Sequence, residues 1–138
     1  METNAITVTT VVNTSTETVW RCWNEPAHIT KWAFASDDWH APYAENDLKI
    51  SGKFLTRMAA KDGSMSFDLV GTYTDVEEFA KIEYTMKDGR KVKIVFEKMD
   101  GATKITETFD PENENPVEMQ KAGWQAILEN FKKHVESN

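Results

Sequence analysis

Residues 91–110 read KVKIVFEKMDGATKITETFD, and apolar side chains alternate with polar ones on both sides of Asp100-Gly101. An Asp-Gly pair supplies the positive φ angles that a tight hairpin turn requires. The pattern therefore predicts two antiparallel strands, over residues 91–99 and 103–110.

The chain before this hairpin also has the pattern of strands. Asp-Gly pairs at 62–63 and 88–89 predict two more tight turns. Gly71 lies inside the longest expected strand, where a glycine often marks a bulge or a bend that lets a sheet curl. Residues 33–46 lack a clear period and are rich in aromatic side chains, so we expect a loop there. The expected strands cover residues 6–12, 48–51, 53–60, 65–76 and 80–87.

Capping signals predict three helices. Thr14 followed by Glu17 matches a capping box and predicts a short helix after the first strand. Pro26 suits the first position of a second short helix, which runs to about Trp32. Asn115 is the expected N-cap of a long C-terminal helix. The apolar stripe of that helix consists of Val117, Gln120, Trp124, Ile127, Leu128, Phe131 and Val135.

Length and composition narrow the class of protein. The 138 residues predict one domain over 1–138, and the net charge of -7 argues against nucleic acid as a partner. No run of about 18 apolar residues occurs, so we expect no membrane span. Residues 1–10 lack the apolar run of a secretion signal and Cys22 is the single cysteine, which together predict a cytoplasmic protein.

The sequence carries no signature of catalysis, of a metal site or of a cofactor. His28, His40 and His134 are far apart along the chain and lack the spacing of a zinc-binding helix. The glycines are scattered, which excludes a glycine-rich phosphate loop. We therefore assign no catalytic residue, no metal and no cofactor.

The order of the expected elements resembles the helix-grip fold of the START-like, or SRPBCC, superfamily, which includes the birch-pollen allergen. Lys31-Trp32, Gly71-Thr72-Tyr73 and Gly123-Trp124 are similar to motifs of one branch, named after the activator of the heat-shock-protein-90 ATPase, in its C-terminal domain. The resemblance covers nearly the whole chain. It implies an α+β fold in which a curved antiparallel sheet of about six to seven strands wraps on a long C-terminal helix.

This resemblance also implies a cavity between the sheet and the helix. The expected function is the binding of a small hydrophobic or amphipathic molecule in that cavity, without catalysis. One alternative is an enzyme of the polyketide-cyclase or aromatase kind, which would use polar side chains in the cavity. A second alternative is a stress-response protein that contacts a chaperone through its surface. Both a monomer and a homodimer are compatible with the resemblance.

Strand alternation and the helix stripe select the apolar side chains that would face the cavity. Trp124 is expected to close one side, and Trp32 and Trp39 are expected at the mouth. Each has an alternative role in core packing, because large apolar side chains are mostly buried. The candidate ligand-binding residues are Trp32, Trp39, Phe54, Met58, Phe67, Tyr84, Phe96, Trp124 and Leu128.

Three polar residues are candidates for the cavity, which the enzyme alternative requires. Glu107 is in register with Ile105 and Phe109, so strict alternation points it inward. An exposed position is nevertheless the favoured interpretation, because strand register is easily shifted by one residue. Arg57 and Asp68 are expected on neighbouring strands, and a surface ion pair is their favoured interpretation.

Overall fold

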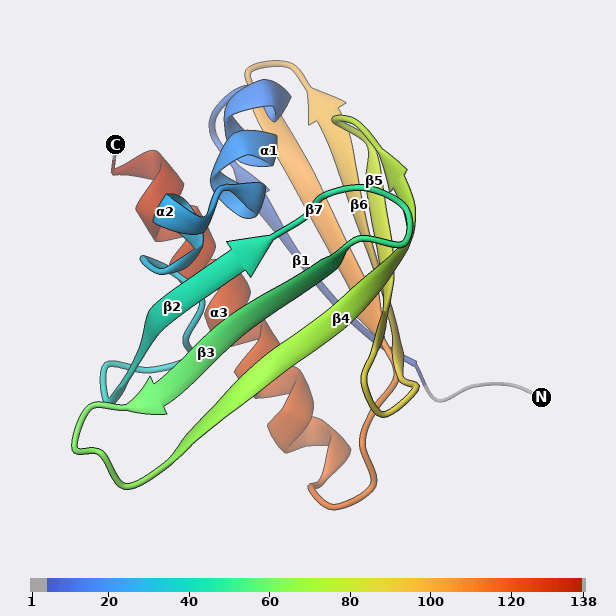
Figure 1. Cartoon of the computed structure of the whole chain (residues 1–138). Coiled ribbons are helices and arrows are strands. Elements are labelled where there is room, and N and C mark those ends of the chain that lie inside the picture. The colour runs from blue at the N-terminus through green and yellow to red at the C-terminus, as the bar shows by residue number, and fades with distance from the viewer. Residues whose placement is uncertain (1–4, 138) are drawn as a thin grey trace.

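The computed structural model describes residues 5–137, and this part of the chain forms seven strands and three helices. All seven strands join one antiparallel sheet in the order β1-β7-β6-β5-β4-β3-β2 (Figure 1). The expected α+β helix-grip architecture is confirmed. The strands are β1 (Ile6–Val12), β2 (Trp39–Asn46), β3 (Lys53–Ala60), β4 (Ser66–Glu77), β5 (Lys81–Met86), β6 (Lys91–Met99) and β7 (Ala102–Phe109), and the helices are α1 (Thr16–Asn24), α2 (Pro26–Ile29) and α3 (Val117–Glu136).

The long helix α3 crosses one face of the curled sheet, with α1 and α2 beside its C-terminal end (Figure 1). Its predicted apolar stripe explains this position, since Leu128 and Phe131 are 0% exposed and Val135 is 4% exposed. Burying a large apolar side chain stabilises a fold by about 1.5 to 3 kcal/mol, so the stripe fixes the helix on the sheet. The core therefore lies between α3, the sheet and the two short helices.

The predicted tight turns are present. Gly63, Gly89 and Gly101 have φ angles of 79°, 95° and 73°, which is the left-handed region that the Asp-Gly pairs were expected to supply. The register shift of the long strand β4, in contrast, lies between Tyr73 and Asp75 and not at Gly71. The expected bulge at Gly71 is therefore wrong, and the role of this glycine belongs to the pocket described below.

The expected strand over residues 48–51 is wrong, and residues 33–46 are only partly a loop. Trp39–Asn46 form β2, the edge strand, which pairs with β3. A bulge between His40 and Tyr43 breaks the alternation that identifies a strand in a sequence. Pro42 fits this position because an edge strand has one side on which no backbone donor is needed.

Two predicted helix caps are also wrong. Ser15 caps α1, since its hydroxyl accepts a hydrogen bond from the Thr18 amide at 3.2 Å, in place of the expected Thr14 and Glu17 box. Asn115 does not cap α3, because the first residue before that helix is Pro116. The helix α2 starts at Pro26 as predicted but ends at Ile29, before Trp32.

The side chain of Gln120 takes over the role expected of a cap on α3. Its Nε2 donates to the carbonyl oxygens of Asn115 and Glu112 at 2.8 and 3.0 Å, and its Oε1 accepts from the Glu112 amide at 2.9 Å. Gln120 therefore ties the loop before α3 to the first turn of the helix.

Candidate functional site

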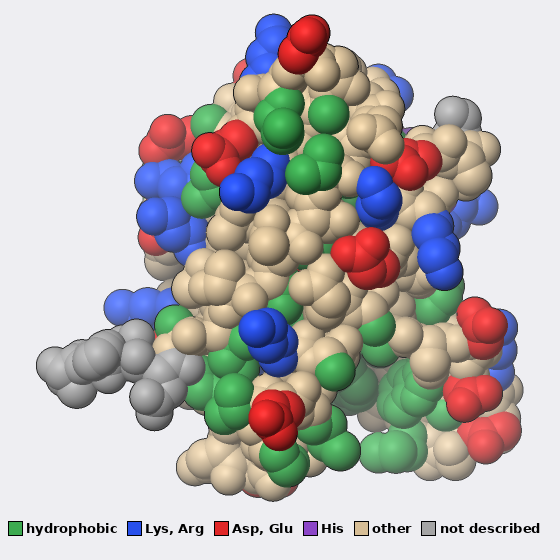
Figure 2. Space-filling view, turned by 180° about the vertical axis from the view of Figure 1, so that it is seen from behind, with side chains coloured by type: hydrophobic (Ala, Val, Ile, Leu, Met, Phe, Trp, Pro, Cys, Tyr) green, Lys and Arg blue, Asp and Glu red, His purple; other side chains and the backbone are tan. Residues whose placement is uncertain are grey.

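A pocket of about 270 Å³ lies between the concave face of the sheet and the N-terminal half of α3. Figure 2 shows a hollow with hydrophobic side chains in its walls, between the start of α3 and the β3–β4 hairpin. The walls come from both short helices, from five strands and from α3. The lining residues are Trp23, Asn24, Ile29, Trp32, Ala33, Asn46, Phe54, Thr56, Met58, Phe67, Leu69, Tyr73, Ile82, Tyr84, Met86, Arg90, Glu107, Glu112, Gln120, Trp124 and Ile127.

Aromatic rings close the inner end of the pocket. The ring centres of Trp23, Trp32 and Phe131 lie 4.9 Å from one another in all three pairs. The indole nitrogen of Trp32 donates to the carbonyl oxygen of Cys22 at 3.0 Å, which fixes this ring against α1. Since these rings already contact each other closely, this end of the pocket has a rigid wall.

The sheet side of the pocket is built around Gly71. A Cβ atom at this position would collide with the rings of Phe54 and Tyr84. Without that atom, the two rings pack edge to face with their centres 4.7 Å apart. Gly71 therefore serves close ring packing on the concave face, which explains a glycine in the middle of a long strand.

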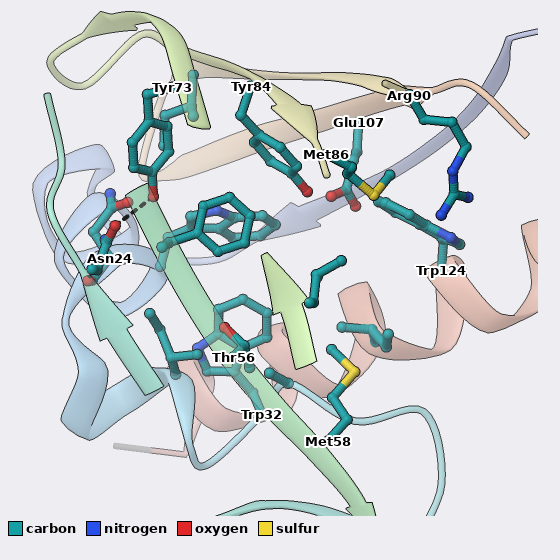
Figure 3. A pocket seen from close by; sticks show the side chains of 18 of the residues that line it. Asn24, Trp32, Thr56, Met58, Tyr73, Tyr84, Met86, Arg90, Glu107 and Trp124 are labelled. Atoms are coloured by element: carbon teal, nitrogen blue, oxygen red, sulfur yellow. Dashed lines mark hydrogen bonds between the residues drawn. The ribbon is translucent and has the colours of Figure 1, made fainter. Parts of the chain in front are cut away.

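A short polar chain lies beside these rings. The hydroxyl of Tyr73 donates to Oδ1 of Asn46 at 2.5 Å (Figure 3). Nδ2 of Asn46 in turn donates to the carbonyl oxygen of Asn24 at 2.8 Å. Burial raises the pKa of Tyr73, so its hydroxyl stays protonated. Because these polar groups already bond to each other, they hold β2 and α1 together at the pocket wall.

Glu107 is the one acidic side chain buried in the apolar part of the pocket wall, among the residues the structure describes. It is 7% exposed and it lines the pocket, so its carboxyl group borders the cavity. Burial raises the pKa of this carboxyl group to about 8. Figure 3 shows the carboxyl group pointing toward the hydroxyl of Tyr84, whose pKa is raised by burial and further by the charge of Glu107. A neutral Glu107 can donate a hydrogen bond to a molecule in the pocket.

The exposed interpretation of Glu107 is wrong, and strict alternation along the strand is right. In the sheet, Glu107 pairs with Val8 on β1 and with Ile94 on β6, and both neighbours are 1% exposed. The hairpin at Asp100-Gly101 keeps β6 and β7 in register without a shift. Because Glu107 lies directly between these two buried residues in the sheet, its carboxyl group must also face the interior.

The outer end of the pocket is more polar. Trp124 stacks on Phe109 with ring centres 3.8 Å apart and an angle of 11° between the ring planes. Arg90, from the turn between β5 and β6, points toward this end (Figure 3). Its Nε lies 2.8 Å from a carboxylate oxygen of Asp88, so one ion pair already holds the guanidinium group. The mouth thus combines a flat apolar wall with a cation at its edge.

The structure brings most of the sequence-predicted residues together. Trp39 instead packs beside Phe67, with ring centres 5.9 Å apart, and it does not line the pocket. Phe96 packs against Trp20 and Leu128 lies in the core. The predicted residues that line the pocket are Trp32, Phe54, Met58, Phe67, Tyr84, Trp124 and Glu107.

Arg57 and Asp68 lie outside the pocket. They pair across β3 and β4, and Nε of Arg57 lies 2.9 Å from Oδ1 of Asp68. The ring of Tyr43 lies 5.7 Å from the guanidinium group. The surface ion pair expected from the sequence is therefore present, and the cavity role that the enzyme alternative gave these two residues is wrong.

Several pocket residues were not among the sequence candidates. Trp23 belongs to α1, and the helical period of that segment predicts only that the side chain of Trp23 packs inward. Tyr73 precedes the shift in β4, and Arg90 and Gln120 reach the rim from a turn and from the first turn of α3. No strand alternation marks a side chain that enters from a turn, so the tertiary arrangement alone identifies Arg90.

The curved sheet, the long C-terminal helix and the pocket between them define a helix-grip, START-like protein. The chain belongs to the family of Activator of Hsp90 ATPase homolog 1-like proteins, whose sequence profile matches residues 13–136. The branch expected from the sequence is thus confirmed. No curated protein matches the chain.

Solved structures agree with this family. The AHSA1-like protein from Aeromonas hydrophila is 43% identical, with a TM-score of 0.91 over 96% of this chain and 92% of that one. A protein from Cytophaga hutchinsonii is 57% identical, with a TM-score of 0.84 over 98% of this chain and 94% of that one. A protein from Chromobacterium violaceum is 20% identical but has a TM-score of 0.87 over 98% and 99% of the two chains, which shows the shared fold.

Within residues 5–137, no helix combines the length and the apolar character needed to cross a bilayer.

Proposed function

We propose that this protein binds a small hydrophobic or amphipathic molecule in the pocket under the N-terminal half of α3. The observation that carries the proposal is the pocket itself, which is walled mainly by apolar and aromatic side chains and includes one buried carboxyl group, that of Glu107. Ligand sites typically combine such walls with a few polar groups that fix orientation. The volume of about 270 Å³ favours a small ligand.

The polar groups indicate which chemistry the ligand has. With a pKa of about 8, Glu107 is mostly protonated at pH 7 and donates a hydrogen bond. Tyr84 supplies a second hydroxyl group on the same wall. A carbonyl or hydroxyl oxygen on a flat apolar molecule would accept these bonds while its rings contact Trp32 and Trp124. The proposed ligand is therefore an apolar molecule with at least one oxygen acceptor.

Tryptophan emission tests this proposal, since Trp23, Trp32 and Trp124 all line the pocket. We expect a saturable change in emission when aromatic ketones or medium-chain fatty alcohols are titrated into the protein. Ile127→Trp should fill the pocket and abolish this response. Lys121→Trp adds the same ring to an exposed position on the same helix and should leave binding intact. The absence of a saturable response to the whole panel, or equal binding by both variants, would refute the proposal.

A second candidate function is proton transfer to or from a bound ketone. Glu107 favours it, because a carboxyl group with a pKa of about 8 can act as an acid or a base near neutral pH. As a base, the carboxylate would remove a proton from the carbon next to the carbonyl group, and the protonated acid would return one. Each turn exchanges one carbon-bound hydrogen with solvent and leaves the ketone otherwise unchanged.

Deuterium exchange separates this candidate from simple binding. If the protein catalyses proton transfer, a bound ketone in heavy water should gain deuterium at the carbon next to its carbonyl group. The exchange rate should rise toward pH 8 as Glu107 loses its proton. Glu107→Gln should abolish the exchange while the ketone still binds. A ketone that binds without enhanced exchange would leave binding as the function.

A further inference from the structure

Three potential metal ligands meet at the end of the molecule away from the pocket mouth. Cys22 on α1, His28 on α2 and His134 near the end of α3 each offer a ligand atom, and these atoms all lie within 4.8 Å of one another. Nδ1 of His28 lies 2.9 Å from Nε2 of His134, although 106 residues separate the two histidines along the chain. The sequence-based argument that the histidines are too far apart for a metal site is therefore wrong for this pair.

We propose that Cys22, His28 and His134 bind a zinc ion. One thiolate and two imidazoles form a donor set that zinc accepts in proteins, with a fourth position left for water or another ligand. Bonds of about 2.0 to 2.3 Å to a tetrahedral ion place the ligand atoms about 3.3 to 3.6 Å apart. To reach this spacing, the two imidazole nitrogens, now 2.9 Å apart, must separate slightly, and any pair of ligand atoms as far apart as 4.8 Å must move closer together.

The surroundings support this geometry. Oε1 of Glu25 lies 3.8 Å from Nε2 of His28, on the side of the ring opposite the one that faces His134. A carboxylate behind a ligating histidine orients the ring and strengthens it as a ligand. The side chain of His28 is 28% exposed, which leaves a route for the ion to enter.

The backbone around the cluster is also fixed. The carbonyl oxygen of Cys22 accepts a hydrogen bond from the indole of Trp32, and Cys22 itself is 3% exposed. Two positive charges near the cluster disfavour a bound cation: Arg21 lies near Cys22, and Lys31 lies near His134. The negative charge of Glu25, near Cys22 and His28, offsets this repulsion. The donor atoms are held by three different helices, so the site exists only in the folded chain.

Cobalt and zinc titrations of the full chain, prepared without a histidine tag, test the proposal. Co²⁺ should bind at about one ion per chain and produce the visible bands of tetrahedral cobalt together with a sulfur-to-cobalt charge-transfer band. Zn²⁺ should displace it and raise the melting temperature of the protein. Cys22→Ser should remove the charge-transfer band.

Histidine variants make the test independent of the buried cysteine. His28→Gln and His134→Gln should each weaken Zn²⁺ binding by about 100-fold or more, since even outer groups of zinc sites contribute about 10- to 100-fold. His40→Gln changes the third histidine, which lies outside the cluster, and should bind Zn²⁺ as the unchanged protein does. Circular dichroism confirms that each variant is folded. Absence of the cobalt bands, or equal zinc affinity in His28→Gln and His40→Gln, would overturn the proposal.

Discussion

The two halves of α3 lie on the same sheet but face different surroundings. In the C-terminal half, Leu128 and Phe131 are completely buried against a packed cluster of aromatic rings. Trp124, in the N-terminal half, and Ile127, at the midpoint of the helix, are only partly buried and border the pocket. One continuous apolar stripe therefore holds the fold together at one end and leaves space for a ligand at the other.

The difference comes from what lies beneath the helix. The short helices α1 and α2 fill the space under the C-terminal half, where Trp23 and Trp32 contact Phe131. Under the N-terminal half, the curled sheet is the facing element, and Gly71 and Glu107 lie on its concave side. A curled sheet cannot reach a straight helix along its whole length, so empty space remains where no second element fills it.

The largest expected effect is a loss of stability when a side chain is removed from the packed C-terminal half of α3. Phe131→Ala should lower the free energy of unfolding by about 3 to 5 kcal/mol, because it leaves a cavity in a fully packed cluster. Denaturant titration of the variant measures the loss. Met119→Ala is the control, since Met119 lies on the same helix but is 61% exposed and should change stability very little. A loss below about 1 kcal/mol for Phe131→Ala would mean that this half is not a packed core.

The second effect concerns the buried carboxyl group in the pocket half. Burial raises the pKa of Glu107 from 4.5 to about 8, so between these two pH values the folded protein keeps a proton that the unfolded chain releases. The stabilisation is complete below about pH 4.5 and is lost as the pH rises toward about 8. The free energy of unfolding should fall by about 1.4 kcal/mol per pH unit in this window, or about 3 kcal/mol from pH 5 to pH 7.

Glu107→Gln isolates this contribution, because an amide does not titrate. Denaturant titrations at pH 5, 6 and 7 should show that the variant lacks the decline, so that it gains stability relative to the unchanged protein as the pH rises. All other titrating groups are common to both proteins and cancel in the difference. Parallel pH profiles for the two proteins would contradict the burial of Glu107.

The smallest of the three effects is expected at Trp124. Trp124→Ala should lower the free energy of unfolding by about 2 kcal/mol, because the ring is half-buried and loses mainly its stacking on Phe109. The variant should lose much more in ligand affinity than in stability. Isothermal titration with the best ligand of the panel, beside denaturant titration, measures both. A stability loss as large as that of Phe131→Ala would remove the distinction between the two halves.

The local features of the fold were accessible from the sequence because they depend on near neighbours. The turns at Gly63, Gly89 and Gly101 follow from the conformational freedom of glycine at positive φ. The stripe of α3 follows from the helical period. The edge strand β2 could not be predicted from the sequence, since its bulge and Pro42 interrupt the alternation of apolar and polar residues. This segment is a strand because it pairs with β3 in the folded chain.

The amino-acid sequence by itself determined β1, the strands from β3 onward, the tight turns, the long terminal helix and the family, because each depends on short-range pattern. The tertiary structure alone decided which side chains share a space. In the folded chain, Glu107 faces the interior between two buried neighbours, and Arg57 lies outside the pocket. His28 and His134 are in contact although 106 residues separate them along the chain. Such contacts depend on how the sheet curls and where the helices dock, and these arise from packing of the whole chain.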